Sequence, residues 1–197
     1  MRIFFTILIL IFSFKSLVKA NDINDFEIEG ISAGESLLKF FDKNFIDREK
    51  FFNYDSDEMY SLYIKENLET YEELEINFKN NDDNYKIQAI AGIEIIDISE
   101  CLKKKKAITK EFKILFSLDS EDYIHKYDND YITSGTNASF TSESRAYISD
   151  WNFPNGDMVR VWCSEWGEDV IREFNWNNEL NVKIQNKDLM DFIRKQN

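Results

Sequence analysis

The chain holds only two cysteines among its 197 residues, Cys101 and Cys163. Only one intramolecular pairing of them exists, and a disulfide would fix a segment near the middle of the chain against one near its end. Closing a loop of about 60 residues would stabilise the fold by roughly 4 kcal/mol in the chain-entropy account. Two buried free thiols are the alternative. A zinc site is less favoured, because only His125 could join the cysteines and structural zinc takes four ligands.

The first twenty residues have the pattern of a secretory signal peptide. A positive charge at Arg2 precedes an apolar run over residues 3–14, and the segment closes on the small residue Ala20. A run of about twelve residues rises roughly 18 Å as a helix, which is too short for about 30 Å of hydrocarbon. We therefore expect cleavage after Ala20, a periplasmic or secreted product and no transmembrane segment in the mature chain. An oxidising compartment favours the Cys101–Cys163 disulfide.

Composition indicates one folded and acidic domain over residues 21–197. Hydrophobic residues make up 43% and aromatic residues 15% of the chain, which argues against disorder. The length fits a single domain. The chain carries 37 acidic against 24 basic residues, with a net charge of −13. Nucleic acid is therefore an unfavourable partner, because phosphate binding requires a basic surface.

Hydrophobic periodicity predicts an α+β fold, an antiparallel sheet with helices packed on one face. The expected strands cover residues 26–31, 59–65, 73–78, 85–96 and 179–184, together with a late hairpin. In the segment 85–96 the odd-numbered residues form one apolar face. The expected helices begin at Ser32, where Glu35 completes a capping box, and lie near 47–52, 99–116 and 187–194. Residues 119–141 are polar and aperiodic, and we expect them to form a long loop.

The segment Trp151–Val159 predicts the late hairpin, because Pro154-Asn155-Gly156 suits a type I turn followed by a left-handed residue. A three-residue loop would place Asp150 opposite Arg160. A two-residue loop would shift each pairing by one residue. The first register is favoured because it puts the ion pair on one face and Cys163 on the apolar face, where Cys101 could meet it.

Three residues near this hairpin are candidates for a binding surface: Trp162, Trp166 and Arg160. All four tryptophans fall between Trp151 and Trp176. Trp162 shares the outward parity of Arg160, so it could contact a ligand or partner from the open sheet face. The alternative is that aromatic residues favour strands and that another element covers this face.

Gly30-Ile31-Ser32-Ala33-Gly34 matches the nucleophile-elbow pattern between an expected strand and an expected helix. A hydrolase would pair Ser32 with His125, the only histidine. Too little chain precedes Ser32 for the large parallel sheet that such an elbow needs, and no glycine-rich oxyanion segment is present. Ser32 is therefore better interpreted as a helix cap, and we expect no catalytic residue set.

Asp128-Asn129-Asp130 resembles the start of a calcium loop. Ile132 occupies the next ligand position and Gly135 comes too late, so a solvated acidic loop is the default and no metal site is expected. The run Lys103–Lys106 is interpreted as a solvated helix face, with an acidic partner or anionic lipid as the alternative.

Three segments carry a family resemblance: residues 25–38, the sequence Ile90–Ile93 ahead of Glu100-Cys101, and residues 159–166. With them the chain resembles small exported proteins of unknown function from AT-rich marine alphaproteobacteria. The resemblance implies bacterial export to the periplasm and brings no known activity, cofactor or catalytic residue.

The sequence favours a non-enzymatic exported binding or interaction module without a cofactor, and its expected partner is another periplasmic or envelope protein. A small serine hydrolase that uses Ser32 and His125 is one alternative. A small-ligand or calcium binder is another.

Overall fold

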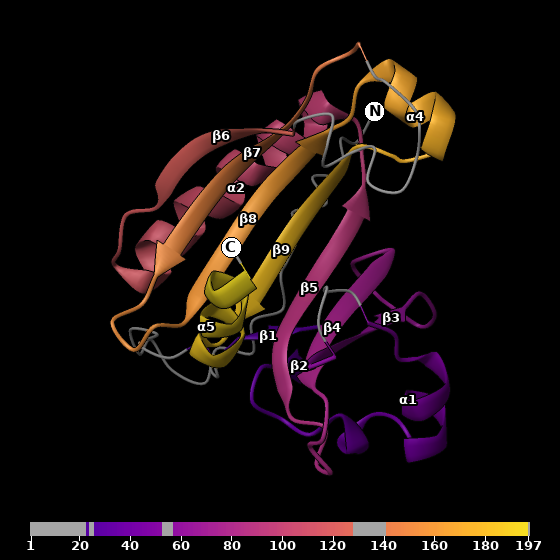
Figure 1. Cartoon of the computed structure of the whole chain (residues 1–197). Coiled ribbons are helices and arrows are strands. Elements are labelled where there is room, and N and C mark those ends of the chain that lie inside the picture. The colour runs from indigo at the N-terminus through magenta and orange to yellow at the C-terminus, as the bar shows by residue number, and fades with distance from the viewer. Residues whose placement is uncertain (1–22, 24–25, 53–56, 128–140, 197) are drawn as a thin grey trace, which may run out of the picture.

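The computed structural model describes residue 23 and residues 26–52, 57–127 and 141–196 (Figure 1). Seven strands form one antiparallel sheet in the order β3-β4-β5-β9-β8-β7-β6, and two short strands form a separate hairpin. The strands are β1 (Glu27–Ile28), β2 (Ile31–Ser32), β3 (Met59–Ile64), β4 (Glu73–Lys79), β5 (Ile87–Ile95), β6 (Glu121–Tyr127), β7 (Ser144–Asn152), β8 (Met158–Glu165) and β9 (Glu179–Gln185). The helices are the 3-10 helix η2 (Leu37–Lys39), α1 (Lys43–Glu49), α2 (Ile98–Phe116), α4 (Glu168–Phe174) and α5 (Lys187–Gln196). The predicted antiparallel α+β fold is confirmed.

The predicted leader, residues 1–20, lies outside the described residues. Within the part of the chain that the structure describes, no helix has the length and apolar character needed to cross a membrane.

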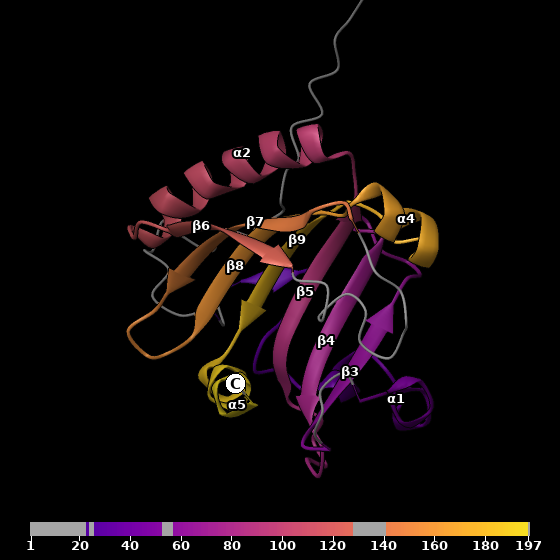
Figure 2. The same cartoon turned by 45° about the horizontal axis from the view of Figure 1, so that its top comes forward.

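Helix α2 packs along one face of the sheet, and Figure 2 shows it on the opposite side from α5. Its buried stripe includes Cys101, Phe112 and Phe116. The rings of Phe112 and Phe116 meet the Trp151 ring of β7 edge-on, with centroids 5.4 and 5.9 Å apart. Such contacts add to the free energy gained by burying the rings. The aromatic packing therefore fixes the helix over β7 and β8.

Cys101 and Cys163 form the predicted disulfide. Their Cα atoms lie 5.9 Å apart, and both residues are fully buried. Cys101 sits in the first turn of α2 and Cys163 near the end of β8. The bond therefore ties the start of the helix to the sheet that the helix covers.

The hairpin of β7 and β8 has the predicted register. The backbone N–H of Phe153 donates to the carbonyl of Asp157 at 3.0 Å, which closes the three-residue loop. Asp150 lies opposite Arg160 on one face. Cys163 points to the core on the other, so the alternation of apolar and polar residues was sufficient to predict this register.

Strand β5 departs from the predicted single apolar face. Its pairing with β4 shifts by one residue at Gln88, which is the extra residue of a β-bulge. The extra residue changes which side chains face each side of the sheet. Ile87 and Ile90 therefore both join the core under α2, while Ala89 joins a second cluster. The odd-numbered residues of 85–96 therefore divide between the two faces, and residues 87–92 are buried on both.

The N-terminal region also departs from prediction. Residues 26–31 do not form one strand, because the chain reverses at Glu29 and Gly30, whose φ angles of +54° and +75° suit a tight hairpin turn. Ser32 belongs to β2 and caps no helix. Ser36 is the cap, and its hydroxyl accepts from the N–H of Leu38 at 3.2 Å ahead of η2.

Three further differences concern less regular segments. Helix α1 begins at Lys43, earlier than the helical turn expected near 47–52. The loop expected over 119–141 was wrong at residues 121–127, which form the edge strand β6 paired with β7. Helix α4 was not predicted. Residues 128–140, which include the Asp128-Asn129-Asp130 segment, lie outside the described residues.

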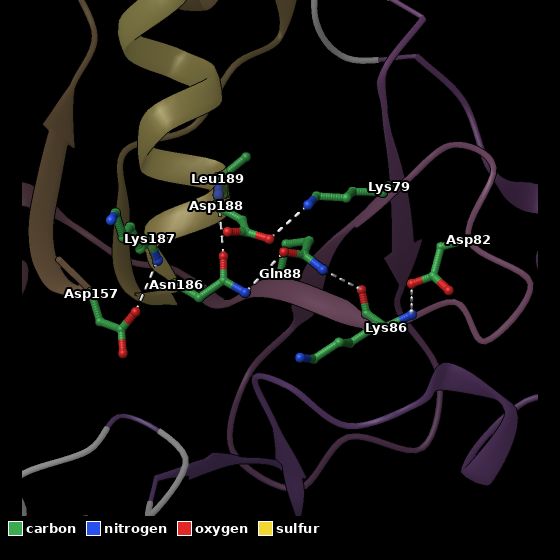
Figure 3. A network of polar contacts seen from close by, with 9 residues as sticks. All are labelled: Lys79, Asp82, Lys86, Gln88, Asp157, Asn186, Lys187, Asp188 and Leu189. Carbon is green, nitrogen blue, oxygen red and sulfur yellow. Dashed lines mark hydrogen bonds and ion pairs between the residues drawn. The ribbon is translucent and has the colours of Figure 1, made fainter. Parts of the chain in front are cut away.

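Helix α5 is the exception to helices on one face. Leu189 and Phe192 pack on Met59 and Ala89, at one end of the sheet face that α2 does not cover. Figure 3 shows how the helix start is held. The Asn186 side chain accepts from the N–H of Leu189 at 3.1 Å and donates to the Gln88 amide at 2.9 Å.

Candidate polar face of the sheet

One residue from each strand of the large sheet forms a row across the face that points away from α2. The pairing registers place these residues opposite one another in turn: Tyr63, Glu75, Ala91, Lys183, Arg160, Asp150 and Glu121. Opposite residues on antiparallel strands project to the same face. We call these seven residues the cross-sheet row. Five of them carry charges, which is unusual for the middle of a seven-stranded sheet.

Arg160 and Asp150 form a two-point ion pair in this row. Arg160 Nε and Nη2 donate to the two Asp150 carboxylate oxygens at 2.7 and 2.8 Å, and the Asp150 side chain is only 8% exposed. Tyr123 OH donates to Asp150 and accepts from Arg160 Nη2. Burial alone would lower the pKa of Arg160, and the hydrogen bonds and charge of Asp150 outweigh it and raise that pKa. The guanidinium therefore stays charged.

Lys183 and Glu75 form the second pair of the row. Their charged atoms lie 3.5 Å apart, and each side chain is 12% exposed. They reach one another across β5 because Ala91, the residue between them, has only a methyl side chain. Asn77 Nδ2 donates to Glu75 at 2.9 Å, which adds a hydrogen bond to the buried carboxylate. The pair is well shielded from solvent, and breaking it would leave a charge buried.

Arg160 and Lys183 are direct cross-strand neighbours. Like charges in this position, with Cβ atoms about 5 Å apart, destabilise a sheet. Each cation has its carboxylate on the side away from the other. Within the described residues, Arg160 Nη1 has no hydrogen-bond partner, and the only ionic contact of Lys183 is the one with Glu75. The two cations therefore stand on adjacent strands at the centre of the face, each held toward its own carboxylate.

Glu179 and Asn181 continue the polar surface along β9. Asn181 Nδ2 donates to Glu179 Oε1 at 3.0 Å. Burial raises the pKa of Glu179, and the negative charges of Glu73 and Glu75 act in the same direction, while the Asn181 hydrogen bond opposes them. The carboxyl group therefore loses its proton less readily than a solvated glutamate does.

The predicted binding residues fall in two places. Arg160 and Trp162 lie on the same face, and Trp162 is half-buried opposite Asn181. Trp166 lies beyond the end of β8, roughly 13 Å along the chain from Trp162 at strand spacing. Its ring stacks on Tyr127 with centroids 4.8 Å apart, in an aromatic cluster beside α4. Trp166 therefore belongs to local packing rather than to the cross-sheet row.

Sequence reasoning missed Glu75, Lys183 and Glu179. The alternation of polar and apolar residues in Glu179–Gln185 does indicate a strand with one polar face. The pairing of that strand between β5 and β8 was not readable from the chain, because it joins segments far apart in sequence. Without this pairing, Lys183 cannot be assigned as the neighbour of Arg160.

The structure does not bring Ser32 and His125 together. Ser32 is buried in β2, where its N–H donates to Glu35 at 3.3 Å, and β2 lies against β5. His125 is exposed on β6, four strands from β5 in the sheet order. Four strand spacings amount to roughly 19 Å. Among the described residues, no group of three or more His, Cys, Asp and Glu side chains could hold a metal ion.

Comparison with known proteins adds no assignment: no family model, curated protein or solved structure matches this chain.

Proposed function

We propose that this chain is an exported, non-enzymatic binding module that holds another periplasmic or envelope protein against the polar face of its sheet. The observation that carries the proposal is the placement of Arg160 and Lys183 opposite one another on adjacent strands at the centre of this face. A fold gains no stability from two neighbouring cations. A partner that presents a carboxylate between them would relieve their repulsion.

The chemistry of this face indicates what the partner presents. Arginine and tryptophan are enriched among the residues that dominate protein interfaces, and Trp162 lies two residues along β8 from Arg160. The proposed contact therefore combines an acidic side chain, received by Arg160 and Lys183, with an apolar group that covers the Trp162 ring. The largely acidic protein surface around it would repel an acidic partner that docks elsewhere.

Export is supported by two features of the chain. Residues 1–20 have the signal-peptide pattern, and disulfides such as Cys101–Cys163 persist mainly in oxidising compartments. The resemblance to exported alphaproteobacterial proteins points in the same direction.

The experiment is site-specific photo-crosslinking in cells that export the full chain. A photo-reactive phenylalanine replaces Trp162, and a matched one replaces Ile114, which is 73% exposed on the outer side of α2. We expect one discrete adduct from position 162 and none from position 114. Lys183→Met should abolish the adduct, whereas Lys110→Met should leave it, with thermal melts to verify folding.

Two outcomes would overturn the proposal. One is an equal or absent adduct at the two positions. The other is covalent labelling by a fluorophosphonate probe that Ser32→Ala abolishes, because it would establish the hydrolase instead.

A further inference from the structure

A groove of about 360 Å³ lies between α2 and the edge strand β6, on the α2 side of the sheet. Leu102 and Ile124 give it apolar walls, and Ile124 is 57% exposed. Lys105 and Thr109 of α2 and Asp122 of β6 provide its polar groups. The groove is separate from the cross-sheet row.

Lys105 differs from the other lysines of its run. It lies four residues after Cys101, so it points toward the sheet, and its ammonium donates to the hydroxyl of the fully buried Ser149. Lys103 pairs with Glu100 and Lys104 with Glu94, as the solvated-face interpretation expects. Lys105 does not fit that interpretation.

The half-buried Lys105 ammonium lacks a counter-ion. Within the described part of the chain, no carboxylate lies within 4.0 Å of its Nζ, although buried charges in proteins are normally paired. Burial lowers the pKa of Lys105, and Asp122 and Asp150 offset this only in part. An ammonium has three donors, and Ser149 takes one.

Thr109 carries a second polar group without a partner, behind the surface of the groove. Its hydroxyl oxygen is buried and has no hydrogen-bond partner among the described residues. A buried hydroxyl without a partner costs about 1–3 kcal/mol. It lines the same groove as Lys105, four residues further along the same helix face.

The charges of the groove select the ligand class. Lys105 and Lys106 against Asp122 leave one net positive charge, which matches a monoanion, and Asp122 would repel a dianion such as phosphate. The volume equals that of roughly a dozen water molecules at about 30 Å³ each, which is enough for a small organic ligand. Leu102 and Ile124 suit a hydrocarbon body.

We infer that this groove binds a small monocarboxylate with an apolar body, with the carboxylate at Lys105 and the hydrocarbon along Leu102 and Ile124. The site is independent of the polar face, so either assignment can fail without the other.

The test titrates the purified, disulfide-bonded protein with octanoate by calorimetry, with octanol, octylamine and inorganic phosphate as comparators. We expect octanoate to bind at least tenfold more tightly than each comparator. Lys105→Met should weaken octanoate binding at least tenfold. Lys103→Met, which removes an exposed lysine of the same helix, should leave it unchanged.

Octanol or phosphate binding as tightly as octanoate would overturn the inference, and this comparison needs no variant. Undiminished octanoate binding by a folded Lys105→Met protein would also overturn it. Chemical-shift changes confined to residues outside α2, β6 and β7 would do the same.

Discussion

Gln88 and Asn186 are joined by two hydrogen bonds of 2.9 Å, one from the Asn186 backbone N–H to the Gln88 carbonyl and one between their side-chain amides. Gln88 is the extra residue of the β5 bulge, and Asn186 caps α5. The bulge of β5 is thus the point where the C-terminal helix is attached to the sheet. Bulges often re-aim a side chain in this way.

Removing the cap should loosen α5 selectively. We expect Asn186→Ala to lower the free energy of unfolding by about 1 kcal/mol, as the loss of a helix cap does. Gln88→Ala should cost less, because the backbone bond remains. Urea denaturation gives the totals, and hydrogen exchange over 187–196 locates the effect. Asn152→Ala, on an exposed residue, is the control, and an equal loss there would refute the role of the cap.

Reduction of the disulfide should destabilise the protein by roughly 2–5 kcal/mol, the usual cost for a native bond. The Cys101→Ser/Cys163→Ser double variant should show the same loss and no further response to dithiothreitol. Denaturant melts with and without reductant measure both. Intact-mass analysis of native material that finds two thiols would contradict the bond.

Glu179 should make stability fall with rising pH. Because burial raises its folded-state pKa, the native state holds the proton in a pH range where the unfolded chain has lost it. The contribution of Glu179 to the free energy of unfolding therefore declines as pH rises from the pKa of the unfolded chain to the pKa of the folded state. It stays low at higher pH. Glu179→Gln should be more stable than the parent at neutral pH and equal to it well below pH 4. Melting curves across pH measure the difference, and a gain that persists in acid would argue against this cause.

Breaking the Arg160–Asp150 pair should cost roughly 2 kcal/mol, between the value for exposed pairs and that for buried ones. Arg160→Met leaves the nearly buried Asp150 carboxylate without its cation. The double variant Arg160→Met/Asp150→Asn should recover part of the loss. Tyr123→Phe removes only the shared hydroxyl and should cost less. Chemical denaturation of the four proteins forms the comparison, and a harmless Arg160→Met would disprove the buried-pair account.

Gly92→Ala should destabilise the sheet by about 1–3 kcal/mol through overpacking. An added Cβ would lie 2.6–2.7 Å from atoms of the Tyr71 ring, which is buried and cannot swing away. Combining Gly92→Ala with Tyr71→Leu should show a smaller penalty than the two single losses added. Ala89→Gly on the same strand tests whether any small-residue change there is costly. Thermal melts compare these proteins.

Patterns between residues close together in the sequence predicted the elements whose formation depends on such neighbours. The hairpin register around Arg160, the helix at 98–116 and the pairing of Cys101 with Cys163 followed from turn chemistry, alternation and cysteine count. The hairpin at Glu29 was missed because a glutamate rarely adopts a positive φ. The Glu29 carboxylate accepts from the N–H groups of Glu69 and Thr70, which helps to hold that turn in place.

Non-local pairing limited the rest. Strand β6 has no apolar alternation because it is an exposed edge, so only its partner β7 reveals it. The bulge at Gln88 changes which side chains of β5 face the core. Gln88 bonds to Asn186, which comes nearly a hundred residues later in the chain. The prediction of the polar face was incomplete for the same reason. Lys183 is a neighbour of Arg160 only because β9 pairs between β5 and β8.

The strand order also divides the sheet into two meanders, β3-β4-β5 and β6-β7-β8-β9, which meet along the single seam between β5 and β9. Helix α2 is the only covalent connection between them along the backbone, and it ends at Phe116. A protease cut just after it would yield two fragments, each with a complete meander. Cys101 belongs to the first fragment and Cys163 to the second, so the nicked molecule would migrate as one species until a reducing agent separates the halves.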